Sequence, residues 1–389
     1  MASPSVNAPS AQSSPRVPVE AQQPSPASRL PSLTGLRFVA ALVVFVYHTS
    51  RTSPTLVLAA DKGFAHDFHE IAQPAGGLGV SFFFVLSGFI LTWSARSTDT
   101  AAAFWRRRAV KIFPNYVLGW AAAMLLFAAA TTPDRTAILN LLTLQSWTPG
   151  FRTYFSVDPP AWSIGVEVLF YALFPLLLPL VRRIGPQHLK YWIGGALLGI
   201  FAVPMTAYLA LPSTPQIVTG PVSDDQFFFA YIFPPARLFD FLLGVLVARA
   251  VQAGRWRNAG MAWSALLLAA GYALSFQVPF LYGQRFVCII PIAMLIAAAA
   301  TADVQGRASL FRSRAMVWLG NISFAFYLLH FVVLVTVRKA LGHELYPTPT
   351  TLAILAADLV ISIAVSGLVY TLVERPVVRR WSSPRRTAA

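Results

Sequence analysis

Charged side chains are scarce in this sequence. They make up 12% of its 389 residues, whereas hydrophobic side chains make up 56%. Soluble domains contain about 25% charged residues, and a single soluble core could not absorb so much apolar surface. The scarcity of charge therefore excludes an ordinary soluble domain and indicates a protein that lies in lipid.

Cysteine is almost absent, since Cys288 is the only one. A single cysteine excludes an intrachain disulfide and a cysteine-based zinc site. The sequence has no cluster of metal-ligand residue types, so we expect no metal site and no tightly bound cofactor. Cys288 lies in an apolar run, which predicts a buried, inert thiol.

Acidic residues are few as well, because 15 Asp and Glu oppose 30 Lys and Arg and leave a formal net charge of +15. In a soluble chain this excess would suggest nucleic-acid binding. Here the basic residues lie in short loops between apolar runs, where Lys and Arg set the orientation of a membrane protein. We therefore expect a lipid bilayer as a partner, and no nucleic acid.

Apolar runs recur from residue 33 to near the C-terminus. Each has about the 20 residues that a helix needs to cross a bilayer. We therefore predict an all-α integral membrane protein, a bundle of about ten transmembrane helices. The expected spans are 33–51, 78–95, 113–130, 161–181, 190–210, 228–250, 259–277, 283–300, 316–338 and 352–373.

The basic residues alternate between the two sides of these spans. One side, which includes both tails, holds 21 Lys and Arg, and the other side holds 7. The positive-inside rule therefore predicts that both termini are cytoplasmic. We divide the chain into a disordered, Pro- and Ser-rich cytoplasmic tail at 1–32, a transmembrane domain at 33–375 and a basic cytoplasmic tail at 376–389.

The first span carries Arg37 and His48 well inside its ends. They are separated by about three helical turns, so they share one face at about 16 Å along the axis. Ionisable residues inside a membrane usually face a cavity or a partner, which favours a functional role. The alternative is that Arg37 reaches lipid headgroups and His48 bonds a backbone carbonyl.

Glu167 follows Trp162 and Ser163 in a span that runs inward from the outer side. Its expected depth is like that of His48, so the carboxylate and the imidazole could form an orienting partner and a base. The alternative is a structural polar pair between packed helices. His330 shows no such partner pattern, and we expect it to matter less.

A basic cluster precedes the third span. Arg108 and Lys111 are three residues apart, hence neighbours on one helical face, and such a cluster suits phosphate groups. The alternative is ordinary topology-setting charge. Arg237 and Asp240 have the same spacing and could simply pair with each other.

These polar residues lie in segments that resemble the motifs of the acyltransferase-3 family of membrane O-acyltransferases. In Lys111 the sequence has a lysine where arginine is more usual, and Val168 replaces a second acidic residue. The resemblance covers about residues 30–380. The matching segments are LTGLRFVAA at 33–41 with Tyr47-His48, GVSFFFVLSGF at 79–89, RAVKIFP at 108–114, WSIGVEVLFY at 162–171, FLLG at 241–244, GNISFAFYLLH at 320–330 and VERP at 373–376.

The resemblance implies that an acyl group moves from acyl-CoA, a co-substrate, to a hydroxyl group. It implies that His48, Glu167 and Arg37 are catalytic. His48 would act as a general base or carry an acyl-histidine intermediate, and the sequence does not separate the two. The residues implied in binding acyl-CoA or the acceptor are Arg108, Lys111, Ser87, Trp162, Ser163, Arg237 and His330.

Within the family, the segment RLPSLTG at 29–35, the chain length and the expected lack of an esterase-like domain look most like macrolide O-acyltransferases of antibiotic-producing bacteria. This resemblance implies a secondary metabolite such as a macrolide as acceptor, and the bacterial plasma membrane as location. One alternative is an O-acetyltransferase of cell-surface glycan or peptidoglycan. A rival from another class is a small-molecule transporter or flippase. Acyl chain length, acceptor and oligomeric state stay open.

Overall fold

The computed structural model describes residues 30–96, 99–342 and 344–382. These residues form α-helices with short 3-10 and π-helical segments, and they contain no β-strand. Nine helical stretches in this part of the chain are long and apolar enough to cross a membrane. The predicted all-α integral membrane bundle is therefore confirmed. Of the two predicted tails, residues 1–29 and 383–389 lie outside the described residues.

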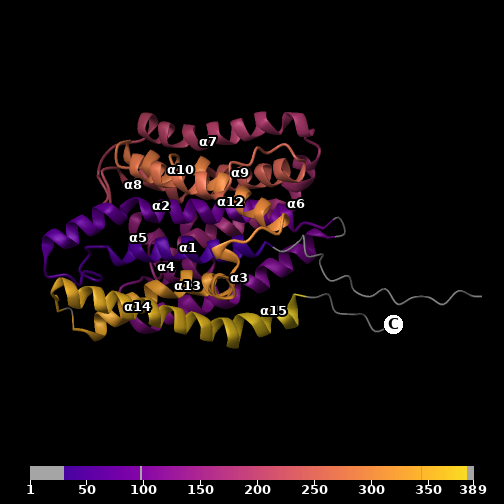
Figure 1. Ribbon diagram of the computed structural model, residues 1–389. Coiled ribbons are helices and arrows are strands. Elements are labelled where there is room, and N and C mark those ends of the chain that lie inside the picture. Colours follow the sequence, from indigo (N-terminus) through magenta and orange to yellow (C-terminus); the bar gives the residue numbers. More distant parts are fainter. Residues whose placement is uncertain (1–29, 97–98, 343, 383–389) are drawn as a thin grey trace, which may run out of the picture.

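The long helices run back and forth along a common direction (Figure 1). They are α1 (Pro31–Thr49), α2 (Lys62–Trp93), α3 (Ala101–Ala123), α6 (Trp162–Arg182), α7 (Leu189–Ala210), α9 (Pro234–Gln252), α12 (Ile289–Val304), α13 (Arg314–Ala340) and α14 (Thr348–Val369). The short helices are α4 (Asp134–Leu141), α5 (Phe151–Tyr154), α8 (Asp224–Phe227), α11 (Phe280–Arg285) and α15 (Arg375–Trp381).

The predicted span at 259–277 differs from the others in the structure. It corresponds to α10 (Met261–Leu274), a helix of 14 residues, which is below the usual crossing length of about 20 residues. It packs against α12. The ten predicted spans are therefore nine long helical stretches and one short helix.

Several helices differ from their predicted bounds, and α2, α3 and α14 differ the most. α3 begins at Ala101 rather than at residue 113. α2 begins at Lys62 rather than at residue 78, because Asp61 caps it by accepting hydrogen bonds from the backbone N–H groups of Gly63 and Phe64. Polar residues in its first turns hide this part of the helix from a hydropathy pattern. At the other end of the chain, α14 passes through a π-helical turn, Tyr370–Glu374, into α15.

The helices form a stack of layers. From top to bottom in Figure 1 the order is α7, α9, α2, α1, α13 and α14, and each helix packs against the next. α1 therefore lies in the middle of the bundle, between α2 and α13. This position places the ionisable residues of the first span among protein helices rather than against lipid.

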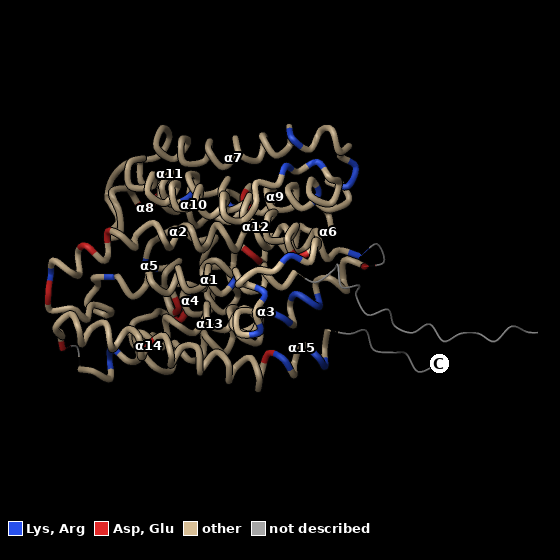
Figure 2. The backbone as a smooth tube through the Cα atoms, in the orientation of Figure 1, with Lys and Arg blue, Asp and Glu red and all other residues tan. Residues whose placement is uncertain are grey.

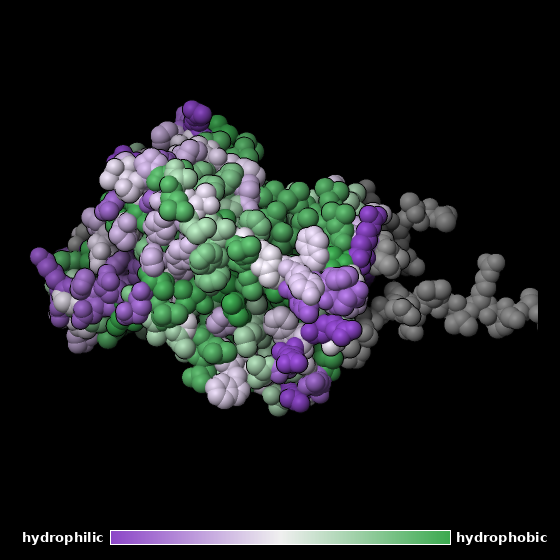
Figure 3. Space-filling view, turned by 90° about the horizontal axis from the view of Figure 1, so that it is seen from above, coloured by the Kyte–Doolittle hydropathy of each residue, from purple (hydrophilic) through white to green (hydrophobic). Residues whose placement is uncertain are grey.

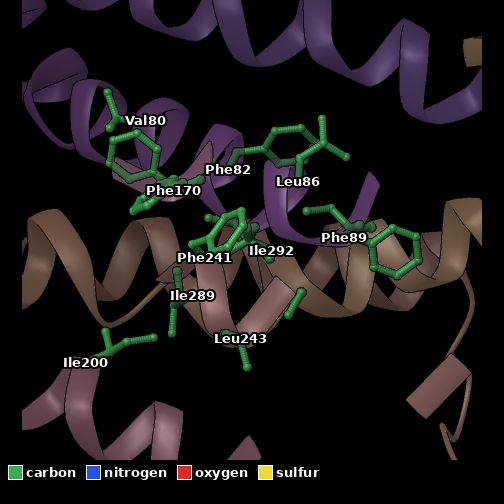
Figure 4. Close-up of a cluster of buried hydrophobic side chains, with 14 of the residues drawn as sticks. Val80, Phe82, Leu86, Phe89, Phe170, Ile200, Phe241, Leu243, Ile289 and Ile292 are labelled. Atoms are coloured by element: carbon green, nitrogen blue, oxygen red, sulfur yellow. The ribbon is translucent and has the colours of Figure 1, made fainter. Parts of the chain in front are cut away.

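A hydrophobic core fixes α2 against α6, α9 and α12 (Figure 4). The rings of Phe170 and Phe241 stack with their centroids 4.6 Å apart. A Cβ atom at Gly88 or Gly244 would collide with the backbone of the facing helix. Such close contact at small residues is typical of membrane helices, and it brings α2 and α9 together backbone to backbone.

The outer surface is apolar between two hydrophilic ends (Figure 3). The outermost helices α7 and α14 expose large hydrophobic side chains, for example Leu198, Leu209, Val360 and Leu368. An exposed apolar surface of this extent marks a membrane contact.

Lysine and arginine gather at one end of the bundle (Figure 2). We call this end, where α1, α3 and α7 begin and α15 ends, the basic end, and the opposite one the distal end. The described residues thus carry the charge asymmetry that the loops of the sequence predict.

Candidate active site

A cavity of about 190 Å³ lies among α1, α2, α3, α6 and α13. Its charged lining residues are Arg37 of α1, Arg108 and Lys111 of α3, and Glu167 of α6. We call it the basic cavity. Residues that are far apart in the sequence meet here because α3 and α6 both pack beside the central helices.

Two of these four charges have close partners. Lys111 forms an ion pair with the buried carboxylate of Glu374. Glu167 accepts a 2.8 Å hydrogen bond from the hydroxyl group of Tyr171. The two arginines, Arg37 and Arg108, form no ion pair with any described residue. The basic cavity therefore carries uncompensated positive charge, which suits an anionic ligand.

The basic cavity continues toward the basic end. Arg108 and Leu91 line both this cavity and a wider one of about 1200 Å³, which we call the vestibule. Further cations line the vestibule, namely Arg96, Arg106, Arg107 and Arg182. A long anionic molecule could contact cations in the vestibule and reach deeper ones at the same time.

A third cavity, of about 290 Å³, contains His48 and is called the histidine cavity. It lies toward the distal end, since Arg51, Ser53 and Thr55, which follow the end of α1, line it. Most of its large lining side chains are aromatic, namely Tyr47, Phe151, Phe155, Trp162, Phe227, Tyr231, Phe280 and Phe331.

His48 is hydrogen-bonded to a second histidine. Its Nδ1 atom lies 3.0 Å from Nε2 of His330, and Nδ1 of His330 lies 3.0 Å from the carbonyl oxygen of Phe326. A carbonyl oxygen only accepts, so Nδ1 of a neutral His330 carries the proton and its Nε2 accepts. His48 must then donate from Nδ1, which leaves its Nε2 as an unprotonated base.

One wall separates the basic cavity from the histidine cavity. Among the described residues, only Val80 of α2 and Tyr327 of α13 line both. The hydroxyl group of Tyr327 lies 2.9 Å from Oγ of Ser163 and donates to the carbonyl oxygen of Pro160 at 3.2 Å. The start of α6 therefore holds this tyrosine in place.

The structure brings most of the predicted site residues together. The basic cavity holds Arg37, Ser87, Arg108, Lys111, Ser163 and Glu167. The histidine cavity holds His48 and Trp162, and His330 touches His48 from behind. The face of α1 that carries Arg37 and His48 therefore lines both cavities, with Arg37 in the basic cavity and His48 in the histidine cavity.

The expected pairing of Glu167 with His48 does not form. Glu167 bonds Tyr171 and lies in the basic cavity with Arg37, whereas His48 bonds His330. The predicted pairing was wrong because Glu167 of α6 lines the basic cavity, whereas α13 supplies the hydrogen-bond partner of His48.

Arg237 lines neither cavity. It is fully buried, with Nε 3.2 Å from Oδ2 of Asp240, and Nη2 donates to Oγ of Ser81 at 3.0 Å. Its guanidinium group lies over the rings of Phe84 and Tyr231. The predicted pairing with Asp240 is confirmed, and these contacts place Arg237 in the packing of α9 against α2.

Three residues of the site did not emerge from the sequence: Tyr171, Tyr327 and Glu374. Each lies in a segment that resembles a family motif, and Tyr327 stands three residues before His330. Their position inside these segments was the signal in the sequence that could have marked them as site residues. Their roles depend on contacts between helices, which a linear spacing does not give.

Comparison with known proteins finds relatives over most of the chain. Acyltransferase MdmB from Streptomyces mycarofaciens is 37% identical over 363 residues, which cover 90% of this chain and 92% of MdmB. O-acetyltransferase OatA from Staphylococcus aureus is 22% identical over 90% of this chain, and the match spans 57% of OatA. No solved structure matches the chain.

The acyltransferase-3 family model, described as an acyltransferase domain, matches residues 30–371. This range begins just before α1 and includes every helix that lines the basic and histidine cavities. With its membrane-spanning helices and this match, the chain belongs to the acyltransferase-3 family.

Proposed function

We propose that this protein transfers an acyl group from acyl-CoA to a hydroxyl group of a small secondary metabolite such as a macrolide. One observation carries the proposal: a cavity with uncompensated arginines and a cavity with an oriented histidine meet at one wall. Acyl transfer needs both, because the donor is anionic and the acceptor hydroxyl must lose a proton.

The donor enters from the basic end. The phosphate groups of CoA contact the arginines of the vestibule and the Arg108–Lys111 cluster, helped by Arg37. The uncharged pantetheine arm extends past these cations into the bundle. The positive-inside rule places this end in the cytoplasm of the producing bacterium, where acyl-CoA is made. CoA is a co-substrate, and no tightly bound cofactor is required.

His48 acts as the general base. Its Nε2 takes the proton of the acceptor hydroxyl, and the oxygen forms a bond with the thioester carbonyl carbon. The carbon–sulfur bond then breaks, and the CoA thiolate takes the proton back from His48. A general base typically contributes on the order of 10²–10⁴-fold. His330 holds His48 in the required tautomer, as the orienting residue of a catalytic triad does.

Glu167 has a positioning role in this scheme. Its carboxylate shares the basic cavity with Arg37 and Arg108 and is itself fixed by Tyr171. A fixed carboxylate orients guanidinium groups through charge. Glu167 thereby keeps the two arginines directed at the donor.

The acceptor occupies the histidine cavity. Its aromatic lining suits a molecule with an extended apolar face and hydroxyl groups, such as a macrolide. The similarity to O-acetyltransferase OatA supports acetyl as the transferred group. The second candidate acceptor, from the sequence, is cell-surface glycan or peptidoglycan. Both candidates share the donor and the base.

The test uses the full chain in lipid nanodiscs. The purified protein is mixed with acetyl-, propionyl- or butyryl-CoA and with either hydroxylated macrolides or muropeptides, and products are identified by mass spectrometry. An acylated macrolide supports the first acceptor, and an acylated muropeptide the second. A parallel assay in lipid vesicles, without acyl-CoA, measures whether macrolides cross the vesicle membrane. If they cross it and no acceptor gains an acyl group in nanodiscs, the protein is a transporter and the proposal is wrong.

A further inference from the structure

The wall between the two cavities poses a problem for the reaction. The cations that hold the donor lie on one side of Tyr327, and the base lies on the other side. The thioester carbonyl must reach His48 while CoA remains bound to the arginines. Either the reacting groups or the wall must therefore move.

Tyr327 is placed to close a path through the whole protein. The basic cavity continues into the vestibule at the basic end, and the histidine cavity lies toward the distal end. If Tyr327 and Val80 did not separate them, the cavities would form one polar passage across the bundle. A membrane acyltransferase with such a passage would conduct protons and would expose the thioester to water.

The contacts of Tyr327 hold its ring between the two cavities, and few of them would have to break for the ring to move. Its ring lies edge-on to Phe83 with centroids 5.5 Å apart, and its hydroxyl group is held by Ser163 and Pro160. Pro160 lies in the 3-10 turn Pro159–Ala161 just before α6, and Ser163 lies in the first turn of α6, which also carries Glu167. Breaking two hydrogen bonds frees the ring without unfolding a helix.

We infer that Tyr327 is a gate residue, whose ring separates the donor and acceptor cavities and swings aside to admit the acyl group to His48. The inference rests on the proposed function for its role in transfer. The closed barrier itself is independent of that role. Excluding water until both substrates are bound is a common use of such a gate.

If Tyr327 is a gate, its truncation should uncouple the release of CoA from the acylation of the acceptor. In Tyr327→Ala the cavities join, so water reaches the thioester, adds to its carbonyl carbon and releases free acid and CoA. The ratio of CoA released to acceptor acylated should therefore rise severalfold. In Tyr327→Phe the ring stays but both anchors are lost, and the ratio should rise by at least about 2- to 10-fold, the change expected for one of the two hydrogen bonds.

A matched pair of variants controls for loss of a buried tyrosine. Tyr116 is also buried and hydrogen-bonded through its hydroxyl group, but it lines neither cavity. Tyr116→Ala and Tyr116→Phe should leave the coupling ratio at the wild-type value. Because Tyr327 and Ser163 share one hydrogen bond, Tyr327→Phe and Ser163→Ala should also be non-additive in a double-mutant cycle.

A second readout needs no substrate. The full chain is reconstituted into liposomes that contain a pH-sensitive dye, and a pH difference is applied. Vesicles with Tyr327→Ala should lose the difference faster than vesicles with the wild type or Tyr116→Ala. A folded Tyr327→Ala with wild-type proton flux and wild-type coupling would overturn the inference. If that variant does not fold, the coupling ratio of Tyr327→Phe decides. A wild type that never consumes acyl-CoA would refute the proposed function, and the proton flux would still test the gate.

Discussion

Nδ1 of His48 lies 3.0 Å from Nε2 of His330, so the imidazole of α1 is oriented by an imidazole of α13. The chain of contacts ends at the carbonyl oxygen of Phe326, which only accepts hydrogen bonds. This sequence of donors and acceptors fixes both tautomers. It leaves Nε2 of His48 free to take a proton, with no carboxylate in the pair.

Replacement of His48 tests the general base. His48→Ala should lower turnover by at least about 100-fold, the smallest contribution expected of a general base. His48→Asn should not restore it, because asparagine forms hydrogen bonds but does not take the proton. The measurement is acylated product per folded protein with both substrates saturating. A variant that keeps more than about a tenth of wild-type turnover would show that His48 is not the base.

Replacement of His330 tests the orienting contact. His330→Ala should lower kcat on the order of 10- to 100-fold, less than loss of the base itself, with little change in KM for acyl-CoA. His330→Gln should recover part of the loss, because its side-chain carbonyl can accept the Nδ1 proton of His48.

The control for His330 is Thr336→Val, which removes a polar group elsewhere on α13. Thr336 bonds only the carbonyl oxygen of Val332 and lines neither cavity. If His330→Ala and Thr336→Val have equal kcat, the contact between the two histidines is merely structural.

Arg108 and Lys111 should respond differently to truncation. Arg108 has no ion pair among the described residues, so Arg108→Ala should raise KM for acyl-CoA with little loss of stability. Arg108→Lys should cost less, because a point charge partly replaces the guanidinium group. Lys111→Ala should lower the unfolding temperature, because it leaves the buried carboxylate of Glu374 without its cation.

KM and thermal unfolding in detergent, measured on the same preparations, separate these effects. Equal KM values for wild type and Arg108→Ala would mean that the basic cluster sets topology and does not bind the donor.

The orientation of the bundle is testable with reporter fusions. Both termini should be cytoplasmic, because the basic loops and tails lie on one side. A reporter that is active only outside the cytoplasm is fused at residue 20 and after residue 380. It should be inactive at both points, and activity at either would reverse or break the proposed topology.

Asp158 should make stability depend on pH. It precedes the sixth helix, is buried, and neither carboxylate oxygen has a hydrogen-bond partner among the described residues. Burial raises the pKa of Asp158 well above its ordinary value. Above that ordinary value the unfolded chain loses a proton that the folded chain keeps, so the free energy of unfolding falls with rising pH, by up to about 1.4 kcal/mol per pH unit.

The variant Asp158→Asn removes this ionisation. Its unfolding temperature should rise relative to that of the wild type as the pH increases from about 5 to 8. The exposed Asp134→Asn serves as the control for loss of one negative charge. Parallel pH curves for the wild type and Asp158→Asn would show that the carboxyl group of Asp158 is not held neutral by the fold.

The amino-acid sequence by itself determined the class of fold. Apolar runs of about 20 residues form membrane-spanning helices, because in lipid the backbone N–H and C=O groups must form their hydrogen bonds within the segment. The same periodicity placed Arg37 and His48 on one face of α1, since this relationship lies within one helix. The ordered motifs likewise identified the family that the comparison shows.

Only the tertiary structure decided which polar residues meet. Glu167 lines the basic cavity with Arg37 and bonds Tyr171 rather than His48. His330 touches His48 because α13 packs on α1, and Tyr327 divides the cavities because it reaches the start of α6. The spacing of residues along one helix determines which side chains share a face of that helix. The depth at which two helices face each other depends on loops and packing, and no local pattern encodes it.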